Sequence, residues 1–189
     1  MLMLFEAGTR GGISICSHRY GKANNPYMKE QHNPKEPNKY MMFLDANNLY
    51  GYAMSQPLPT VGFKWMTKTQ LKRWEKLPCI LEVDLEYPKE LHDLHNDYPL
   101  APESIPINGV YKLTPNFKDK ENYPIHHTVL KQYLSLGMKL VKIQVHCITF
   151  NESNWMKPYI DLNTDLRAKA TTEFEKDFFK LINTLFLER

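Results

Sequence analysis

The sequence predicts an α+β protein that combines antiparallel strands with a long amphipathic helix. Residues 79–87 alternate between apolar and acidic side chains, which is typical of a half-buried antiparallel strand. From Asn163 onward, apolar residues recur at spacings of three and four, which is typical of an amphipathic helix. The 189 residues are enough for one substantial hydrophobic core or two small ones.

The first forty residues are expected to contain little regular structure. Residues 2–5 have the apolar character of a helix end, and residues 8–12 read as a turn because they contain three glycines. Residues 17–39 are polar and rich in asparagine and proline, which favours a long loop.

The next segment, residues 41–52, combines an apolar run with an acidic residue. Residues 41–44 are apolar and lead into Asp45, so we expect a buried strand that ends there. A carboxylate held at a strand end and still open to solvent suits a metal ligand. The alternative is that Asp45 caps the turn or helix that follows. A short helix is expected from Tyr50 to Met54, ended by Pro57.

The middle of the chain is expected to hold two strands and two helices. Residues 67–76 and 126–136 read as helices, the second ended by Gly137. Residues 88–124 contain six prolines and read as loops. The alternating strand at 79–87 should bury its apolar side chains and leave its acids solvated. A second long strand is expected over 138–150, with an apolar face formed by Val141, Ile143, Val145 and Cys147.

The last predicted element is a single helix over residues 163–187, capped by Asn163 or Thr164. At about 100° per residue, Lys169, Lys176 and Lys180 fall within roughly 40° of one another on this helix. Its apolar stripe is formed by Leu166, Ala170, Phe174, Phe178, Leu181 and Leu185.

Composition narrows the possible classes of protein. The net charge of +3 fits a local basic surface. The 3 cysteines include no CxxC pair, which favours reduced thiols in an intracellular protein, either nuclear or cytoplasmic. No apolar run approaches the length of a membrane span, so no membrane partner is expected.

The order of residues around Asp45 resembles a known motif. The stretch from Asp45 to Gly51 is similar to motif A of family B DNA polymerases, written D-x-x-S-L-Y-P, with Asn48 in place of serine and Gly51 in place of proline. Nearly the whole chain resembles the family B polymerases encoded by large self-synthesising transposons of the Maverick or Polinton type and by their viral relatives, which are protein-primed. The stretches that carry the resemblance are 39–55, 81–88, 95–103, 130–140, 157–163 and 174–181.

The resemblance implies a partial polymerase palm with an inserted subdomain and a long fingers helix. Residues 1–57 would link from the exonuclease side and carry motif A. Residues 58–150 would form the insertion between motifs A and B with part of the palm, and 151–189 the start of the fingers. Lys180 matches the lysine of motif B, K-x-x-x-N-S-x-Y-G, whereas Thr184 replaces its asparagine.

The implied chemistry is the transfer of a deoxynucleotide to a primer with two Mg²⁺ ions. Asp45 would be the catalytic metal ligand. Nucleotide binding would fall to Asn48, Leu49, Tyr50, Arg167, Lys176 and Lys180, with the Tyr50 ring beneath the sugar. The turn at residues 9–12 is similar to the Y-x-G-G motif that touches the template in these polymerases. DNA contacts would therefore come from Arg10, Gly11, Gly12 and Lys169.

The expected partners are a DNA primer–template, deoxynucleoside triphosphates and a priming terminal protein. The second catalytic aspartate of the family lies in a D-T-D motif, and these 189 residues contain no such motif. We therefore expect this fragment to be inactive by itself, because a Mg²⁺ site of this kind needs two carboxylates. The alternative is a non-catalytic remnant of a transposon polymerase that binds nucleic acid or protein.

Overall fold

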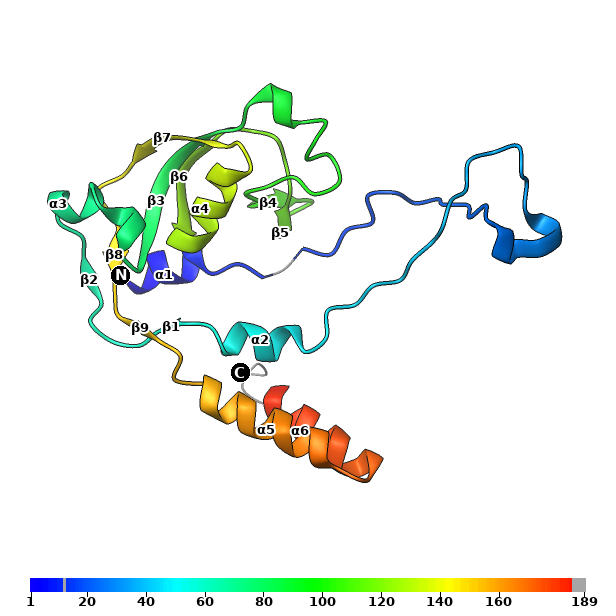
Figure 1. Ribbon diagram of the computed structural model, residues 1–189. Helices are drawn as coiled ribbons and strands as arrows, with labels where there is room; N and C mark the ends of the chain where they lie inside the picture. The colour runs from blue at the N-terminus through cyan, green and yellow to red at the C-terminus, as the bar shows by residue number, and fades with distance from the viewer. Residues whose placement is uncertain (12, 185–189) are drawn as a thin grey trace. The chain divides into compact units, whose positions relative to one another are not determined.

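The computed structural model describes residues 1–11 and 13–184 (Figure 1). Gly12, one of the residues expected to contact DNA, lies outside them. The chain divides into two compact units. The first unit comprises residues 1–43 and 64–149, and the second comprises residues 44–63 and 150–189. Helices and antiparallel strand pairs occur together, which confirms the expected α+β class.

The first unit is built on a five-stranded sheet whose central strand is β3, Cys79–Glu86. Strand β3 pairs with β6 along one edge and with β8 and then β7 along the other, while β2 pairs with β8. Every one of these pairings is antiparallel. The partner strands are β2 (Lys64–Trp65), β6 (Lys120–His126), β7 (Lys139–Ile143) and β8 (Ile148–Thr149).

Strand β3 confirms the alternation read from the sequence. Its apolar face is buried, and the carboxylate-bearing residues between remain partly exposed. Helix α4, His127–Ser135, packs against β3 and β6 and adds Leu130 to the core (Figure 1). Helix α1, Leu2–Gly8, lies on the opposite face, where a side chain at Gly8 would press on Ile80. The start of β3, at Ile80, is thus covered on both faces, whereas its acidic residues stay partly exposed.

The prediction of one long strand over residues 138–150 is wrong. This segment forms two strands, β7 and β8, which pair with different parts of β3. The register shifts within β7, because Leu140 pairs with Leu85 and Lys142 with Asp84. The extra residue between them, Val141, is exposed, and so is Val145. A bulge of this kind reverses the inside–outside alternation beyond it.

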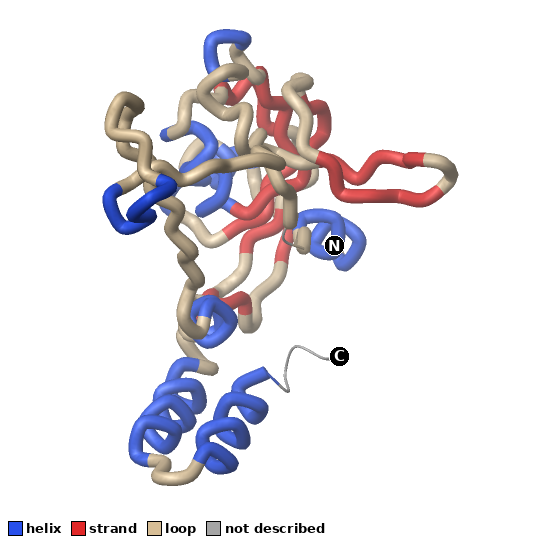
Figure 2. The backbone as a smooth tube through the Cα atoms, turned by 90° about the vertical axis from the view of Figure 1, so that its right-hand side faces the viewer, coloured by secondary structure: helices blue, strands red, loops and turns tan. Residues whose placement is uncertain are grey.

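Residues 88–124, expected to be loops, contain two complete strands and most of a third. Strands β4 (Glu103–Ile107) and β5 (Val110–Thr114) form a hairpin that extends from the rest of its unit in Figure 2. The turn between them, Asn108–Gly109, has positive φ at both residues, which is the favoured hairpin geometry. Strand β6 contains Pro124 and lies at the sheet edge, where a proline is tolerated.

Short helical turns complete the first unit. The helix expected over 67–76 is shorter than predicted: α3 (Lys68–Leu71) begins with a capping box between Thr67 and Gln70, and a separate 3₁₀ turn, η2, follows at Trp74–Lys76. The 3₁₀ turns η1 and η3 span Pro26–Gln31 and Lys89–Leu91. The long loop that contains η1 is closed at its base by backbone hydrogen bonds between Asn24 and Lys39.

The prediction of a buried strand at residues 41–44 is also wrong. These residues form no strand, and their relative exposures lie between 70% and 93%. Among the described residues, no strand pairs with them, and an extended segment is buried only when neighbouring strands satisfy its backbone groups. Asp45 therefore follows an exposed connecting segment rather than a strand end.

The described residues of the second unit form three helices and a two-stranded ribbon. Helix α2, Leu49–Met54, agrees with the short helix predicted after motif A. Its Met54 packs with Met156 and Ile160 in a small core. The other elements are β1 (Leu58–Pro59), β9 (Glu152–Ser153), α5 (Lys157–Lys169) and α6 (Glu173–Thr184). Strands β1 and β9 pair with each other.

The single C-terminal helix expected from the sequence is instead the pair α5 and α6, which run side by side (Figure 1). The break falls at Ala170, which is extended, and the new helix starts because Thr172 and Glu175 bond to each other's backbone N–H groups. Helix α5 begins at Lys157, before the predicted start, so Asn163 is buried inside it and is not a cap. Among the described residues, no helix is long and apolar enough to cross a membrane.

Candidate functional site

A cavity of about 670 Å³ lies within the second unit. One wall is formed by residues 45–51, which are the loop before α2 and the first turn of that helix. Helix α5 contributes Arg167, and α6 contributes Lys180 and Asn183. The complete lining is Asp45, Ala46, Asn47, Asn48, Leu49, Tyr50, Gly51, Arg167, Lys180 and Asn183.

The wall before α2 depends on an unusual backbone conformation. Asn48 has φ 51° and ψ 43°, a left-handed conformation that asparagine adopts more readily than most residues. A Cβ atom at Gly51 would overlap the Asn48 carboxamide. The asparagine and the glycine, which are the two departures from motif A, therefore fit each other.

Two cations and one carboxylate surround the cavity. Arg167 and Lys180 carry positive charge from α5 and α6, and Asp45 carries negative charge from the facing loop. This arrangement can hold an anion such as a phosphate chain beside one metal-binding carboxylate. Six of the residues predicted from the sequence are brought together here: Asp45, Asn48, Leu49, Tyr50, Arg167 and Lys180.

Two other predicted residues of these helices lie elsewhere. Lys176 forms an ion pair with Glu173, with 2.8 Å between Nζ and Oε1. The pKa of the Glu173 carboxyl is lowered mainly by its hydrogen bond to Lys176, with a smaller effect from Arg167. Lys169 is exposed at the end of α5, whereas Lys176 and Lys180 are on α6. The three lysines therefore do not share one helix face, as the prediction of a single helix required.

The predicted DNA-contacting turn lies in the first unit, where Arg10 is already engaged. Its Nη1 donates to the carbonyl oxygen of Pro124 at 2.6 Å, and its guanidinium lies 3.9 Å from the ring centroid of Tyr123. Arg10 and Gly11 also line a second cavity of about 530 Å³ together with Glu103 and other residues of β4–β6. Arg10 therefore holds residues 9–11 of the turn against strand β6.

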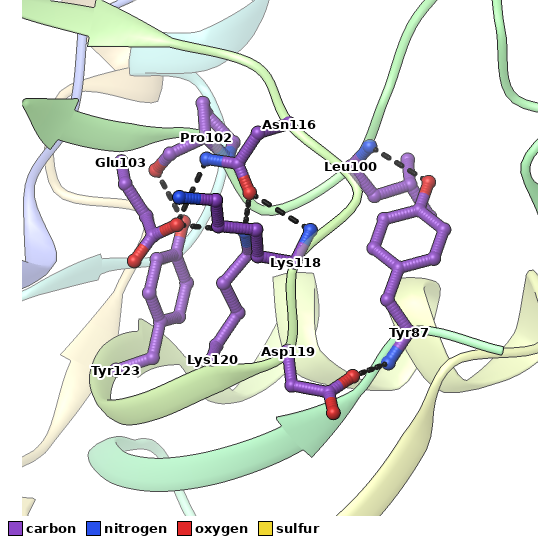
Figure 3. A network of polar contacts seen from close by, with 9 residues as sticks. All are labelled: Tyr87, Leu100, Pro102, Glu103, Asn116, Lys118, Asp119, Lys120 and Tyr123. Atoms are coloured by element: carbon purple, nitrogen blue, oxygen red, sulfur yellow. Dashed lines mark hydrogen bonds and ion pairs between the residues drawn. The ribbon is translucent and has the colours of Figure 1, made fainter. Parts of the chain in front are cut away.

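The first unit contains an ion pair between a buried lysine and the partly exposed Glu103, which also lines the second cavity (Figure 3). Lys120 has a fully buried side chain, and its Nζ donates to Glu103 at 2.8 Å and to Asn116. Burial lowers the pKa of the Lys120 ammonium, against the raising effect of Glu103. Burial also acts to raise the pKa of Glu103, but its hydrogen bonds to Lys120 and Asn116 outweigh this and the pKa is lowered. Separately from this network, the Tyr123 hydroxyl donates to the carbonyl oxygen of Pro102 at 2.9 Å.

The cavity of the second unit fits one part of a magnesium site. Mg²⁺ is commonly held by one or two carboxylates together with substrate phosphates. Asp45 is exposed at the cavity wall and can supply one carboxylate, while Arg167 and Lys180 can hold the phosphates. The residues present therefore suit a metal that arrives with a phosphorylated substrate.

Asn183 is the lining residue that sequence reasoning missed. It lies one helical turn beyond Lys180. The residue could have been predicted from this spacing, because residues three apart share a helix face.

Comparisons with models of known protein families, with curated proteins and with solved structures find no match to this chain.

Proposed function

We propose that this chain is part of a family B, protein-primed DNA polymerase and that the cavity of the second unit binds the incoming deoxynucleoside triphosphate. The observation that supports this is the shared cavity itself. The residues resembling motif A and the lysine resembling motif B are far apart in the sequence, yet both line it. We would not expect an unrelated α+β domain to place the residues that resemble motif A and the lysine that resembles motif B around one cavity.

Each residue has a distinct task in this proposal. Arg167 and Lys180 bind and neutralise the phosphates, and the Tyr50 ring lies under the sugar. Asp45 would hold Mg²⁺, which when bound supplies charge stabilisation for the transferred phosphate. Lys176 supports the phosphates only if its pairing with Glu173 opens. Arg10, Gly11 and Lys169 are proposed to contact the DNA primer–template.

The first test is nucleotide binding by the 189-residue chain. Lys180→Ala and Arg167→Ala should each weaken dATP binding about tenfold or more, because each removes a charged hydrogen-bond donor to phosphate. Isothermal titration calorimetry without metal measures this directly. Lys72→Ala, an equal charge change at an exposed site of the first unit, is the control and should leave dATP affinity unchanged. Equal effects of all three variants would contradict the proposal.

A second test concerns the sugar. Tyr50→Val should reduce the preference for dATP over ATP about tenfold, because removal of the ring opens space for a 2′-hydroxyl. The affinity for dATP itself should change little. The comparison needs dATP and ATP titrations with both proteins, and an unchanged ratio would mean that Tyr50 does not lie beneath the sugar.

A further inference from the structure

Asn183 carries a hydrogen-bond acceptor that the fold does not use. The residue is 5% exposed, and its Oδ1 atom is shielded from water and has no hydrogen-bond partner among the described residues. Buried polar atoms are nearly always paired, since an unpaired one costs folding free energy. Asparagine is also a weak helix former, so its position inside α6 is not explained by helix propensity.

The position of this acceptor at the cavity wall indicates what could satisfy it. Lys180 lies on the same face of α6, about 5 to 6 Å away between Cβ atoms by helix geometry, so a single small molecule can reach both. Lys180 and Arg167 only donate, which suits phosphate oxygens. The Asn183 oxygen only accepts, and a phosphate chain has no donor to offer it.

We propose that Asn183 is a specificity-determining residue whose side-chain oxygen accepts a hydrogen bond from the nucleoside part of the ligand, a sugar hydroxyl or a base N–H. The cavity would then distinguish a nucleoside triphosphate from a bare phosphate chain of equal charge. This inference rests on the proposed function. It adds a residue for which the resemblance to motif B provides no counterpart, since Thr184 occupies the motif's asparagine position.

The test uses the intact 189-residue chain and two ligands, dATP and inorganic tripolyphosphate. Asn183→Leu keeps the branched shape and the number of side-chain heavy atoms and removes the acceptor. It should weaken dATP binding about fivefold to tenfold and leave tripolyphosphate binding unchanged, because only the nucleoside contact is lost. Lys180→Ala, in contrast, should weaken both ligands. A 3′-deoxy analogue of dATP separates the two possible donors: if its affinity no longer depends on Asn183, the sugar hydroxyl is the donor.

A matched control variant is available in the same unit. Asn163 is also 5% exposed, and its buried amide nitrogen has no hydrogen-bond partner in the described part of the chain, but it does not line the cavity. Asn163→Leu should therefore leave both affinities unchanged. Thermal unfolding without ligand adds a second readout: Asn183→Leu should keep or raise Tm, whereas a purely structural role for Asn183 would lower it.

The outcomes separate this inference from the proposed function. If dATP binds the unmodified chain and Asn183→Leu binds it equally well, the inference is overturned while the nucleotide site stands. If Asn183→Leu weakens dATP and tripolyphosphate alike, or lowers Tm, Asn183 only shapes the cavity and the inference is again overturned. If the unmodified chain binds neither ligand, the proposed function fails and the inference fails with it.

Discussion

Replacing Asp45 by asparagine is expected to abolish templated nucleotide incorporation in a polymerase that joins this chain to a second palm carboxylate and a thumb. Asparagine keeps the size of the side chain and removes the charge that would hold the metal ion. Losing such an interaction costs several kcal/mol of transition-state stabilisation, so the rate should fall about a thousandfold or more.

The measurement is primer extension on a labelled hairpin with three proteins compared side by side. The 189-residue chain should show no incorporation with Mg²⁺ or Mn²⁺, the extended protein should be active, and its Asp45→Asn variant should be inactive. Asp161→Asn is the control, because Asp161 is an exposed acid of the same unit that pairs with Lys157. Activity in the extended Asp45→Asn protein would show that Asp45 is not a metal ligand, and the N-cap position of α2 is held by Asn48 rather than by Asp45. An inactive extended protein that still binds nucleotide would favour the non-catalytic alternative.

The largest expected effect on stability comes from breaking the buried pair in the first unit. Glu103→Leu leaves the ammonium group of Lys120 buried without its carboxylate and should lower the free energy of unfolding by about 3 kcal/mol. Lys120→Met should cost less, because the Glu103 side chain that it leaves behind is 33% exposed. Urea unfolding followed by circular dichroism measures both changes.

The double variant Glu103→Leu/Lys120→Met tests the cause. With both charges removed, stability should return to within about 1 kcal/mol of the unmodified protein, because no unpaired charge remains buried. Glu86→Leu is the matched control: it breaks an exposed pair with Lys139 and should cost much less than Glu103→Leu, because exposed ion pairs contribute little to stability. Additive losses in the double variant would show that the side chains act through packing alone.

The same pair predicts a pH dependence. The pKa of Glu103 is lower in the folded chain, so its contribution to stability is present above the ordinary pKa of glutamate. That contribution is lost as the pH falls through the folded-state value. Lys120→Met should therefore reduce the difference in unfolding free energy between neutral and acidic solution, and an unchanged difference would contradict the pairing.

Local patterns predicted the elements whose burial repeats regularly along the chain. In strand β3 burial alternates from Leu81 onward because one face meets the core, and α4 ends at Ser135, two residues before Gly137, whose φ of 103° few other residues adopt. The resemblance to motifs A and B led to Asp45, Tyr50 and Lys180, which line one cavity in the structure. Their roles in catalysis remain predictions.

Errors arose where a neighbouring element overrides the local pattern. The apolar residues 41–44 read as a buried strand, but burial requires paired neighbours, and these residues are exposed. The bulge at Val141 has no signature in its own sequence, since it depends on how β7 pairs with β3. The helix break before Thr172 could have been predicted from the sequence, because Thr172 and Glu175 have the spacing of a capping box.

The α+β class, the central strand β3, the helix after Asp45 and the residue types that suit the proposed nucleotide site could be predicted from the amino-acid sequence. The packing of α5 beside α6, which brings Arg167 and Lys180 to the same cavity as Asp45, could be seen in the folded chain alone. The same holds for the separation of Lys169 from Lys176 and for the Asn183 acceptor, which has no partner in the part of the chain that the structure describes. Periodicity along a chain reports which side of an element is buried, whereas the identity of the neighbours depends on how separate elements pack.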